Sequence, residues 1–171
     1  MIVKKVSIRG IFFFYLLFMV PVNLHAGDWS SSFGVGINNP TGPLGNIVDS
    51  DISMGLGMEY NYNKYYSAEL NLGNDSFKGK FGGPDLDVAH LSINGKRYYY
   101  LSLGTPFVLG GVGIYNFDPG NTDVGLNVGA GWQWNLTKKL AIEAASRYHF
   151  IDTSGSNSEF YTVHVGGRFR F

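Results

Sequence analysis

A two-residue alternation of apolar and small or polar residues recurs along most of this chain, and it limits the possible folds more than any other feature. In residues 52–60, Ile, Met, Leu, Met and Tyr alternate with Ser, Gly, Gly and Glu. Residues 66–72, 124–134, 140–145 and 161–171 repeat the pattern. A period of two is that of a β-strand with two unlike faces. No apolar run in this part approaches the roughly 20 residues of a membrane-spanning helix, so the chain is predicted to be all-β.

The less apolar face of these segments separates a membrane barrel from a soluble sandwich. It carries mostly Gly, Ser, Ala and Asn, with few charges. A strand face turned to water would carry Lys, Thr, Glu and Gln, whereas small residues suit the crowded interior of a narrow barrel. Segments near residues 29–37, 86–99 and 107–115 raise the expected strands to eight, the smallest usual number for a single-chain outer-membrane barrel. The phase of 107–115 stays open, because glycines fall on both faces.

Aromatic residues gather near the ends of the expected strands, with Leu, Val, Ile and Ala between them, as at the two interfaces of a membrane. The set expected at the periplasmic rim is Tyr60, Tyr62, Tyr65, Tyr66, Tyr98, Tyr99, Trp132, Trp134, Phe169 and Phe171. The set expected at the external rim is Tyr115, Phe117, Tyr148, Phe150, Phe160 and Tyr161. The sequence thus predicts an eight-stranded antiparallel up-and-down transmembrane β-barrel.

The connections fit this orientation of the barrel. Those near residues 61–64, 101–106 and 135–139 are short, as periplasmic turns are. Residues 38–51 and 74–85 are longer and rich in Gly, Pro, Asn and Asp, as external loops are. The remaining external loops, 116–121 and 151–158, are modest in length. None of them is large enough to form a plug or a further domain.

The first 26 residues have the order of a secretory signal peptide. Lys4, Lys5 and Arg9 precede an apolar run from Ile11 to Val22, which a short polar stretch follows. We expect cleavage after Ala26, so that residues 1–26 are removed and residues 27–171 form the barrel domain. That part retains 10 basic against 13 acidic residues, about −3 in formal charge, which gives no indication of nucleic-acid binding. The chain has no cysteine, which excludes a disulfide scaffold.

The C-terminal segment, His164 to Phe171, reads His-Val-Gly-Gly-Arg-Phe-Arg-Phe. It resembles the C-terminal β-signal of outer-membrane proteins, and this resemblance implies that His164, Gly166, Phe169 and Phe171 are read by the barrel-assembly machinery. The whole expected barrel resembles the OmpA/OmpX-like outer-membrane β-barrel superfamily. That resemblance implies location in the outer membrane of a Gram-negative cell, contact with outer-membrane lipid and lipopolysaccharide, periplasmic chaperones during biogenesis, and a monomer.

Enzymatic activity is the main alternative to a structural role. Some eight-stranded barrels deacylate lipid A with a His and a Ser on the outer surface, and Ser146 to His149 invites the comparison. The residue two beyond His149 is Ile151 rather than Ser, so the spacing for nucleophilic catalysis is absent and His149 is expected at an interior or rim position. His90 and His164 are expected on separate strands with no acidic or cysteine partner at ligand spacing, and no metal, cofactor or catalytic set is predicted.

Six charged residues fall on the inward faces of the expected strands: Glu59, Glu69, Glu143, Arg147, Arg168 and Arg170. A charge inside a narrow barrel has to be paired, so they are predicted to form a plug of salt bridges in which Glu143 meets Arg168. An ion-conducting channel is the third hypothesis. It ranks below the other two because the interior of an eight-stranded barrel is filled by side chains. The function expected from the sequence is therefore a non-enzymatic outer-membrane barrel in envelope structure or surface interaction, of the adhesion or resistance type. The alternative is a lipid A hydrolase.

Overall fold

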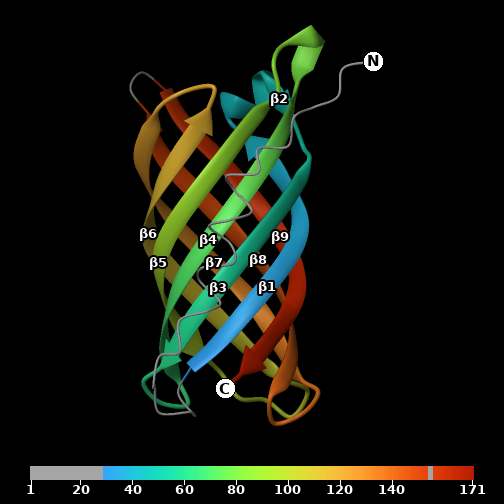
Figure 1. Ribbon diagram of the computed structural model, residues 1–171, viewed down its shortest axis with the longest axis vertical. Coiled ribbons are helices and arrows are strands. Elements are labelled where there is room, and N and C mark those ends of the chain that lie inside the picture. Colours follow the sequence, from blue (N-terminus) through green and yellow to red (C-terminus); the bar gives the residue numbers. More distant parts are fainter. Residues whose placement is uncertain (1–28, 154–155) are drawn as a thin grey trace.

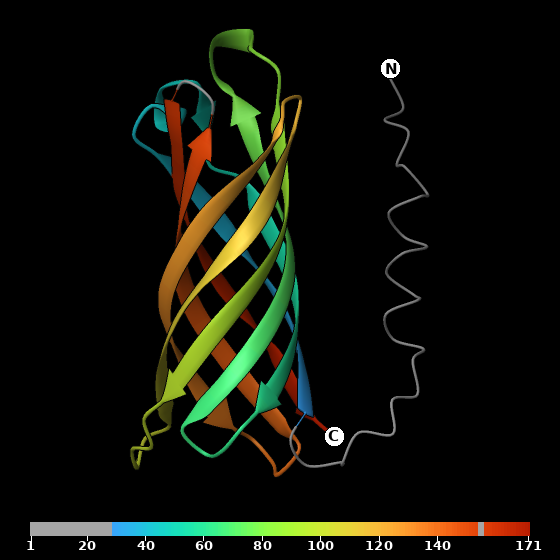
Figure 2. The same ribbon diagram turned by 90° about the vertical axis from the view of Figure 1, so that its left-hand side faces the viewer.

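The computed structural model describes residues 29–153 and 156–171, which form a tall, closed barrel of antiparallel strands (Figures 1 and 2). The long strands of this part of the chain are β1 (Trp29–Thr41), β3 (Ile52–Asn61), β4 (Tyr66–Gly79), β5 (Leu86–Tyr98), β6 (Thr105–Asp118), β7 (Thr122–Asn135), β8 (Leu140–Thr153) and β9 (Ser156–Arg170). Each pairs with its neighbour in the chain, and β9 pairs with β1 to close the barrel. The prediction of eight barrel strands is confirmed. The expected signal peptide, residues 1–26, lies outside the described residues.

Small additional elements lie in the long connections. A two-residue strand, β2 (Val48–Asp49), pairs with the end of β4. Two short 3-10 turns, η1 (Leu44–Asn46) and η2 (Lys80–Gly82), lie at the same end of the barrel. Across residues 29–153 and 156–171, no helix has the length and hydrophobicity needed to span a membrane.

The alternation sets which side chains face inward, as predicted. On β7, for example, Val124, Leu126 and Val128 are exposed on the outer surface, whereas Asn127 is buried in the interior. The structure also settles the phase of β6. Phe107, at its start, is buried inside, and Val108 beside it is exposed on the lipid side.

The strands run further than expected at the end with the longer connections. β4 stays paired with β5 up to Phe77, which lies inside the segment 74–85 that was predicted to be a loop. β6 likewise continues to Asp118 and β8 to Thr153. Polar residues such as Asn74 face outward there. Strand pairing needs only backbone hydrogen bonds, so a polar segment beyond the lipid can remain in a strand. Such a segment has no apolar face, and its sequence therefore does not show the alternation by which a strand is recognised.

Four aromatic residues assigned to the lipid-facing rims lie in the interior instead: Tyr98, Tyr115, Phe117 and Phe160 are all buried. The rim prediction considered how far along a strand each residue lies and not which face it occupies. Because successive side chains alternate between faces, position along the strand places a ring at the correct depth without placing it in lipid. Others remain outside, including Tyr66, Trp134, Phe150 and Phe169, which are exposed at the two ends.

The seam between β1 and β9 depends on a glycine. Gly166 pairs with Gly34, and a Cβ atom at Gly166 would lie 1.9 Å from the Phe33 carbonyl oxygen and 2.7 Å from Gly34 Cα. These are backbone atoms and cannot turn aside as a flexible side chain can. Glycine at this position therefore permits the close approach of the first and last strands that closes the barrel.

Candidate functional site in the barrel interior

Lys96 is the centre of an ionic layer in the half of the lumen nearer the short turns. Its Nζ lies 3.1 Å from Glu59 Oε2, 2.9 Å from Glu69 Oε1 and 3.5 Å from Glu143 Oε1. The side chain is fully buried. One ammonium group thus joins carboxylates from three strands, β3, β4 and β8.

Two arginines complete the layer. Arg168 donates through Nη1 to Glu59 Oε2 at 2.6 Å, and through Nη2 and Nε to Glu143 Oε2 at 2.6 and 3.0 Å. Arg147 Nη2 lies 2.9 Å from Glu69 Oε2. Three carboxylates and three cations thus balance in charge, the condition under which buried ions are tolerated.

The structure brings together five of the six charged residues expected in the lumen, and it adds Lys96. The sixth, Arg170, lies at the mouth, where it donates to Asn135 Oδ1 at 2.7 Å. Sequence reasoning missed Lys96 because the segment 86–99 was recognised as a strand without being divided into faces. The alternation of His90, Ser92, Asn94 and Lys96 with Leu91, Ile93 and Gly95 was the available signal.

Further from the short turns, a second polar cluster contains the histidines. Ser53 Oγ lies 2.5 Å from Asp75 Oδ1 and 2.7 Å from His164 Nε2. Asp75 Oδ2 lies 3.2 Å from His90 Nδ1. His90 thus has an acidic neighbour on the adjacent strand β4, which the spacing of residues along the chain did not indicate. Residues distant in the chain meet here because the closed wall places their strands around one narrow lumen.

His149 lies in the same interior. Its Nδ1 is 2.9 Å from the Tyr115 hydroxyl, and its ring stacks on Phe160 with 4.5 Å between ring centroids. Ser146, in contrast, faces outward. The side chains of Ser146 and His149 are thus on opposite sides of the wall, and they do not form the His and Ser pair that an outer-surface deacylase uses.

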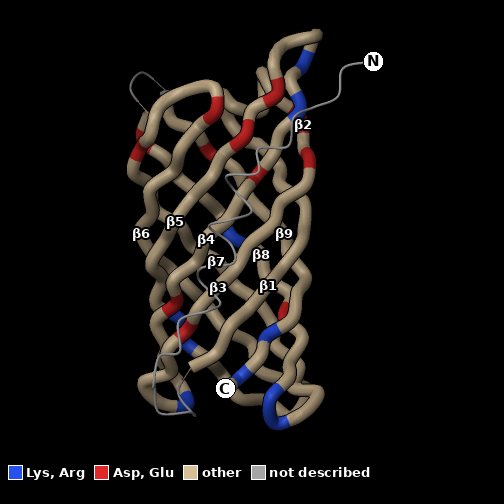
Figure 3. The backbone as a smooth tube through the Cα atoms, in the orientation of Figure 1, with Lys and Arg blue, Asp and Glu red and all other residues tan. Residues whose placement is uncertain are grey.

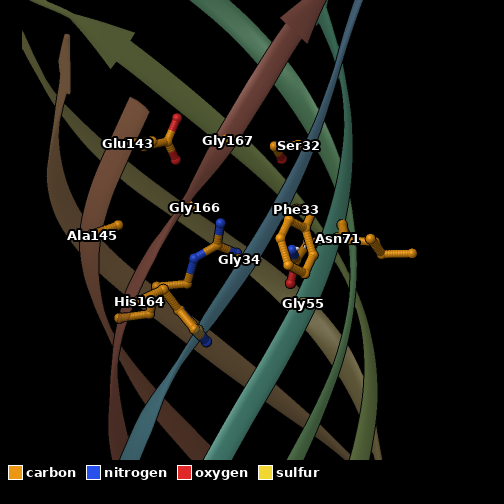
Figure 4. Close-up of a pocket in the computed structure, with 12 residues that line it drawn as sticks. Ser32, Phe33, Gly34, Gly55, Asn71, Glu143, Ala145, His164, Gly166 and Gly167 are labelled. Carbon is orange, nitrogen blue, oxygen red and sulfur yellow. Dashed lines mark hydrogen bonds between the residues drawn. The ribbon is translucent and has the colours of Figure 1, made fainter. Parts of the chain in front are cut away.

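A small cavity of about 40 Å³ separates the two polar clusters (Figure 4). Figure 4 shows Glu143, Asn71 and His164 around it, where Gly34, Gly55 and Gly166 leave the inner wall without side chains. Nε and Nη1 of Arg147, another lining residue, have no hydrogen-bond partner in the described protein. The volume and the polar lining suit ordered water.

An apolar cluster fills the lumen at the opposite end from the short turns. It lies under η1 and β2, and its buried members are Leu44, Val48, Phe77, Val88, Tyr115, Phe117, Ile151 and Phe160. Phe77 and Phe160 pack edge to face, with 5.3 Å between ring centroids. The connection that contains η1 and β2 is therefore held against the barrel by burial of Leu44 and Val48 rather than left as a free loop.

The two ends of the barrel differ in charge (Figure 3). We use the term acidic crown for the carboxylates at the end with the long connections, Asp49, Asp51, Asp85, Asp87, Asp118, Asp123, Asp152 and Glu159. Among the described residues at this end of the barrel, only Lys78 and Lys80 are cationic. The opposite end carries Lys64, Lys138 and Lys139 in its turns.

The residues of the expected assembly signal all lie on β9 or directly after it. His164 and Gly166 face the interior, whereas Phe169 and Phe171 are exposed on the outer surface. Phe171 N donates to the Trp29 carbonyl at 3.1 Å, so the chain end is paired with the start of β1.

A comparison with protein families identifies this architecture. The family model described as the outer membrane protein beta-barrel domain matches residues 12–171. The chain belongs to this family. The barrel is accordingly an outer-membrane protein, and its lipid-exposed belt of Leu, Val and Ile is the surface that contacts the bilayer. No curated protein matches the sequence.

Solved structures of outer-membrane proteins share the fold of this barrel at low sequence identity. Neisserial surface protein A has a TM-score of 0.68 at 14% identity, covering 84% of this chain and 97% of its own. The outer membrane protein OprG from Pseudomonas aeruginosa has a TM-score of 0.64 at 17% identity, covering 85% and 96%. The outer membrane enzyme PagL has a TM-score of 0.54 at 12% identity, covering 83% and 99%. Both enzymes and surface proteins are thus built on this fold, so the function has to be argued from the residues.

Proposed function

We propose that this protein is a non-enzymatic, closed outer-membrane barrel that contributes to envelope structure and displays its external hairpins for surface interaction. The filled lumen is the observation that carries the proposal. Two different barriers follow each other along the barrel axis. The first is the ionic layer around Lys96 and Arg168, and the second is the apolar cluster around Phe77 and Phe160.

These barriers argue against a conducting pore. An ion entering from the short-turn end would have to separate pairs such as Arg168–Glu59 at 2.6 Å, and then pass between packed rings such as Phe77 and Phe160, which cannot replace its water. The test is single-channel recording of the refolded barrel in planar bilayers. We expect no steps above the protein-free baseline, and reproducible unitary conductance would contradict the proposal.

The external end is suited to display. Its strands continue beyond the lipid belt, and the apolar cluster anchors the connection with η1 and β2. The acidic crown favours a partner with a basic surface, because it concentrates negative potential at one end of the molecule. Neisserial surface protein A, which has the same fold, is by its name a surface protein, and this supports a role of the same kind.

The surface role can be tested on cells that produce the full chain. A crown variant with Asp85→Asn, Asp87→Asn and Asp118→Asn should lose binding to polylysine-coated surfaces. A control with Lys138→Gln and Lys139→Gln changes charge at the periplasmic end and should bind as the parent does. Equal binding by the crown variant and the parent, at equal surface levels, would refute a role for the crown.

The non-enzymatic part of the proposal rests on the separation of Ser146 and His149 by the barrel wall. Purified barrel in detergent should release no fatty acid from lipid A over many hours, as measured by mass spectrometry of the lipid product. Loss of an acyl chain at a rate proportional to barrel concentration would overturn it.

The biogenesis partners follow from the same proposal. The barrel-assembly machinery is proposed to read His164, Gly166, Phe169 and Phe171, and the two exposed aromatics support this because they lie on the outer face near the chain end. Periplasmic chaperones would hold the chain before insertion. We propose a monomer in the membrane, which cross-linking in native outer membranes would test.

A further inference from the structure

A larger cavity, about 400 Å³ in volume, lies at the periplasmic mouth of the lumen, below the ionic layer. The ends of β1, β3, β5, β7 and β9 form its wall, together with Asn63 and Lys64 of the turn after β3. Its volume is in the range of small-molecule sites. The ionic layer closes its inner end, so it is a blind vestibule and not part of a channel. We call it the periplasmic vestibule.

The carboxylate that lines the vestibule, Glu59, is already satisfied. Its Oε1 accepts from the Tyr98 hydroxyl at 2.5 Å, and its Oε2 accepts from Arg168 at 2.6 Å and lies 3.1 Å from Lys96 Nζ. No other Asp or Glu of the described residues lines the vestibule. Glu59 therefore contributes little negative potential to this space.

Two cations at the mouth have no such compensation. Lys64 and Arg170 line the vestibule, and neither has a salt bridge within the described part of the chain. Asn135 Oδ1, at 2.7 Å, and the more distant Lys138 carbonyl, at 3.5 Å, orient the Arg170 guanidinium. Lys64 Nζ lies 4.8 Å from the centre of the Tyr65 ring. A narrow space with two uncompensated cations and walls of low dielectric attracts anions.

Amide groups at the mouth add neutral donors. Asn135 Oδ1 accepts from Arg170 and from Gln133 Nε2 at 3.0 Å, so the part of Asn135 left for a ligand is its NH₂ group. Asn63 Oδ1 accepts from the backbone of Tyr65 and Tyr66 at 2.8 and 3.0 Å, which leaves its NH₂ group in the same way. The lining is therefore rich in donors around a positive centre.

We propose that the periplasmic vestibule binds a small phosphate ester, with Arg170 and Lys64 contacting the phosphate and the amides of Asn63 and Asn135 contacting polar groups of the ester. Guanidinium and ammonium groups are the common protein partners of phosphate. This site is separate from the external hairpins, so it stands independently of the proposed surface role. A phospholipid headgroup and a soluble sugar or glycerol phosphate share this chemistry.

The first experiment titrates glycerol 3-phosphate into the full barrel in phosphatidylcholine nanodiscs, followed by amide NMR signals. We expect saturable shifts at Lys64 and Asn135, none at Val128 on the lipid face, and none at any of these residues with neutral glycerol. Arg170→Gln and Lys64→Gln should each weaken binding about tenfold, the effect of losing one charged hydrogen bond. The absence of saturable shifts in the parent barrel would overturn the proposal.

Lys139→Gln is the matched control. It removes a cation from the same end of the barrel, but Lys139 Nζ lies 5.8 Å from the centre of the Phe169 ring and does not line the vestibule. We expect this variant to bind as the parent does. Equal weakening by Lys139→Gln and Arg170→Gln would mean general attraction to a basic surface and would also overturn a defined site.

A third arm distinguishes the two sources of phosphate ester. In nanodiscs that contain phosphatidylglycerol, a site that takes lipid headgroups would already be occupied, so glycerol 3-phosphate would bind several-fold more weakly than in phosphatidylcholine. A site for soluble esters would keep the same affinity in both. The first result assigns a lipid ligand, and the second a periplasmic solute.

Discussion

Removing Arg168 and Glu143 together should lower the free energy of unfolding by less than the sum of the two separate removals. Arg168→Met leaves Glu59, Glu69 and Glu143 facing Lys96 and Arg147, a net charge of −1 in the lumen. Glu143→Gln leaves a net charge of +1. Breaking one side of a buried pair costs about 3–5 kcal/mol, because the remaining charge is desolvated without its partner. Arg168→Met should be the costlier variant, since Arg168 contacts Glu59 as well as Glu143.

The double variant restores the balance with two carboxylates and two cations. Its free energy of unfolding should therefore exceed the additive expectation by about 1–3 kcal/mol. The assay is urea unfolding in lipid vesicles, followed by tryptophan fluorescence, for the parent, both single variants and the double variant.

The salt bridge between Lys80 and Asp49 at 3.2 Å provides a control pair. The two side chains are 28% and 65% exposed, and exposed pairs contribute at most about 1 kcal/mol. Lys80→Met and Asp49→Asn should therefore show little coupling. If Arg168→Met and Glu143→Gln were additive to within about 0.5 kcal/mol, the charge-balance reasoning would be wrong.

Three further outcomes are expected. Val128→Arg should cost about 2–4 kcal/mol in vesicle unfolding, because Val128 faces lipid near mid-strand, whereas Val128→Leu should be nearly neutral; equal losses would refute the strand phase. Gly166→Val should prevent closure of the barrel, because its Cβ would meet the Phe33 carbonyl; a normal heat-modifiable gel shift would argue otherwise. Deletion of Phe171 should leave export intact but impair insertion, visible as periplasmic degradation in fractionated cells; normal outer-membrane levels would show that the assembly signal is wrong.

Much of the fold could be predicted from the sequence because a transmembrane strand has to keep one face apolar along its whole length. Every second residue, such as Leu126 and Val128, is therefore apolar because it faces lipid. The residue between them, Asn127, must then face the interior. Where the chain leaves the lipid, this constraint ends. The ends of β4 and β8 consequently read as loops, although their backbones remain paired.

The interior was less predictable, because parity shows that a residue faces inward but not which residue it meets. The contact between Ser53 and His164 joins positions 111 residues apart, and no spacing in the sequence indicates it. The contact of Glu143 with Arg168 was easier to infer, because one hairpin, β8–β9, carries both residues. Phe160 could not be placed in the apolar cluster from its position along β9 alone, because that position gives the depth of the ring but not the face of the strand that carries it.

The opposite charges of the two ends bear on how this barrel enters the membrane. In the orientation predicted from the lengths of the connections, the hairpins that carry the acidic crown cross the hydrocarbon during insertion, whereas the turns with Lys64, Lys138 and Lys139 stay on the periplasmic side. A carboxylate is less costly at the bilayer midplane than Arg or Lys, which cost about 2–4 kcal/mol each in barrels. Two lysines, Lys78 and Lys80, lie at the crown end and three lie in the turns. For an equal number of charges, a hairpin that carries carboxylates therefore costs less to move through the bilayer than one that carries lysines.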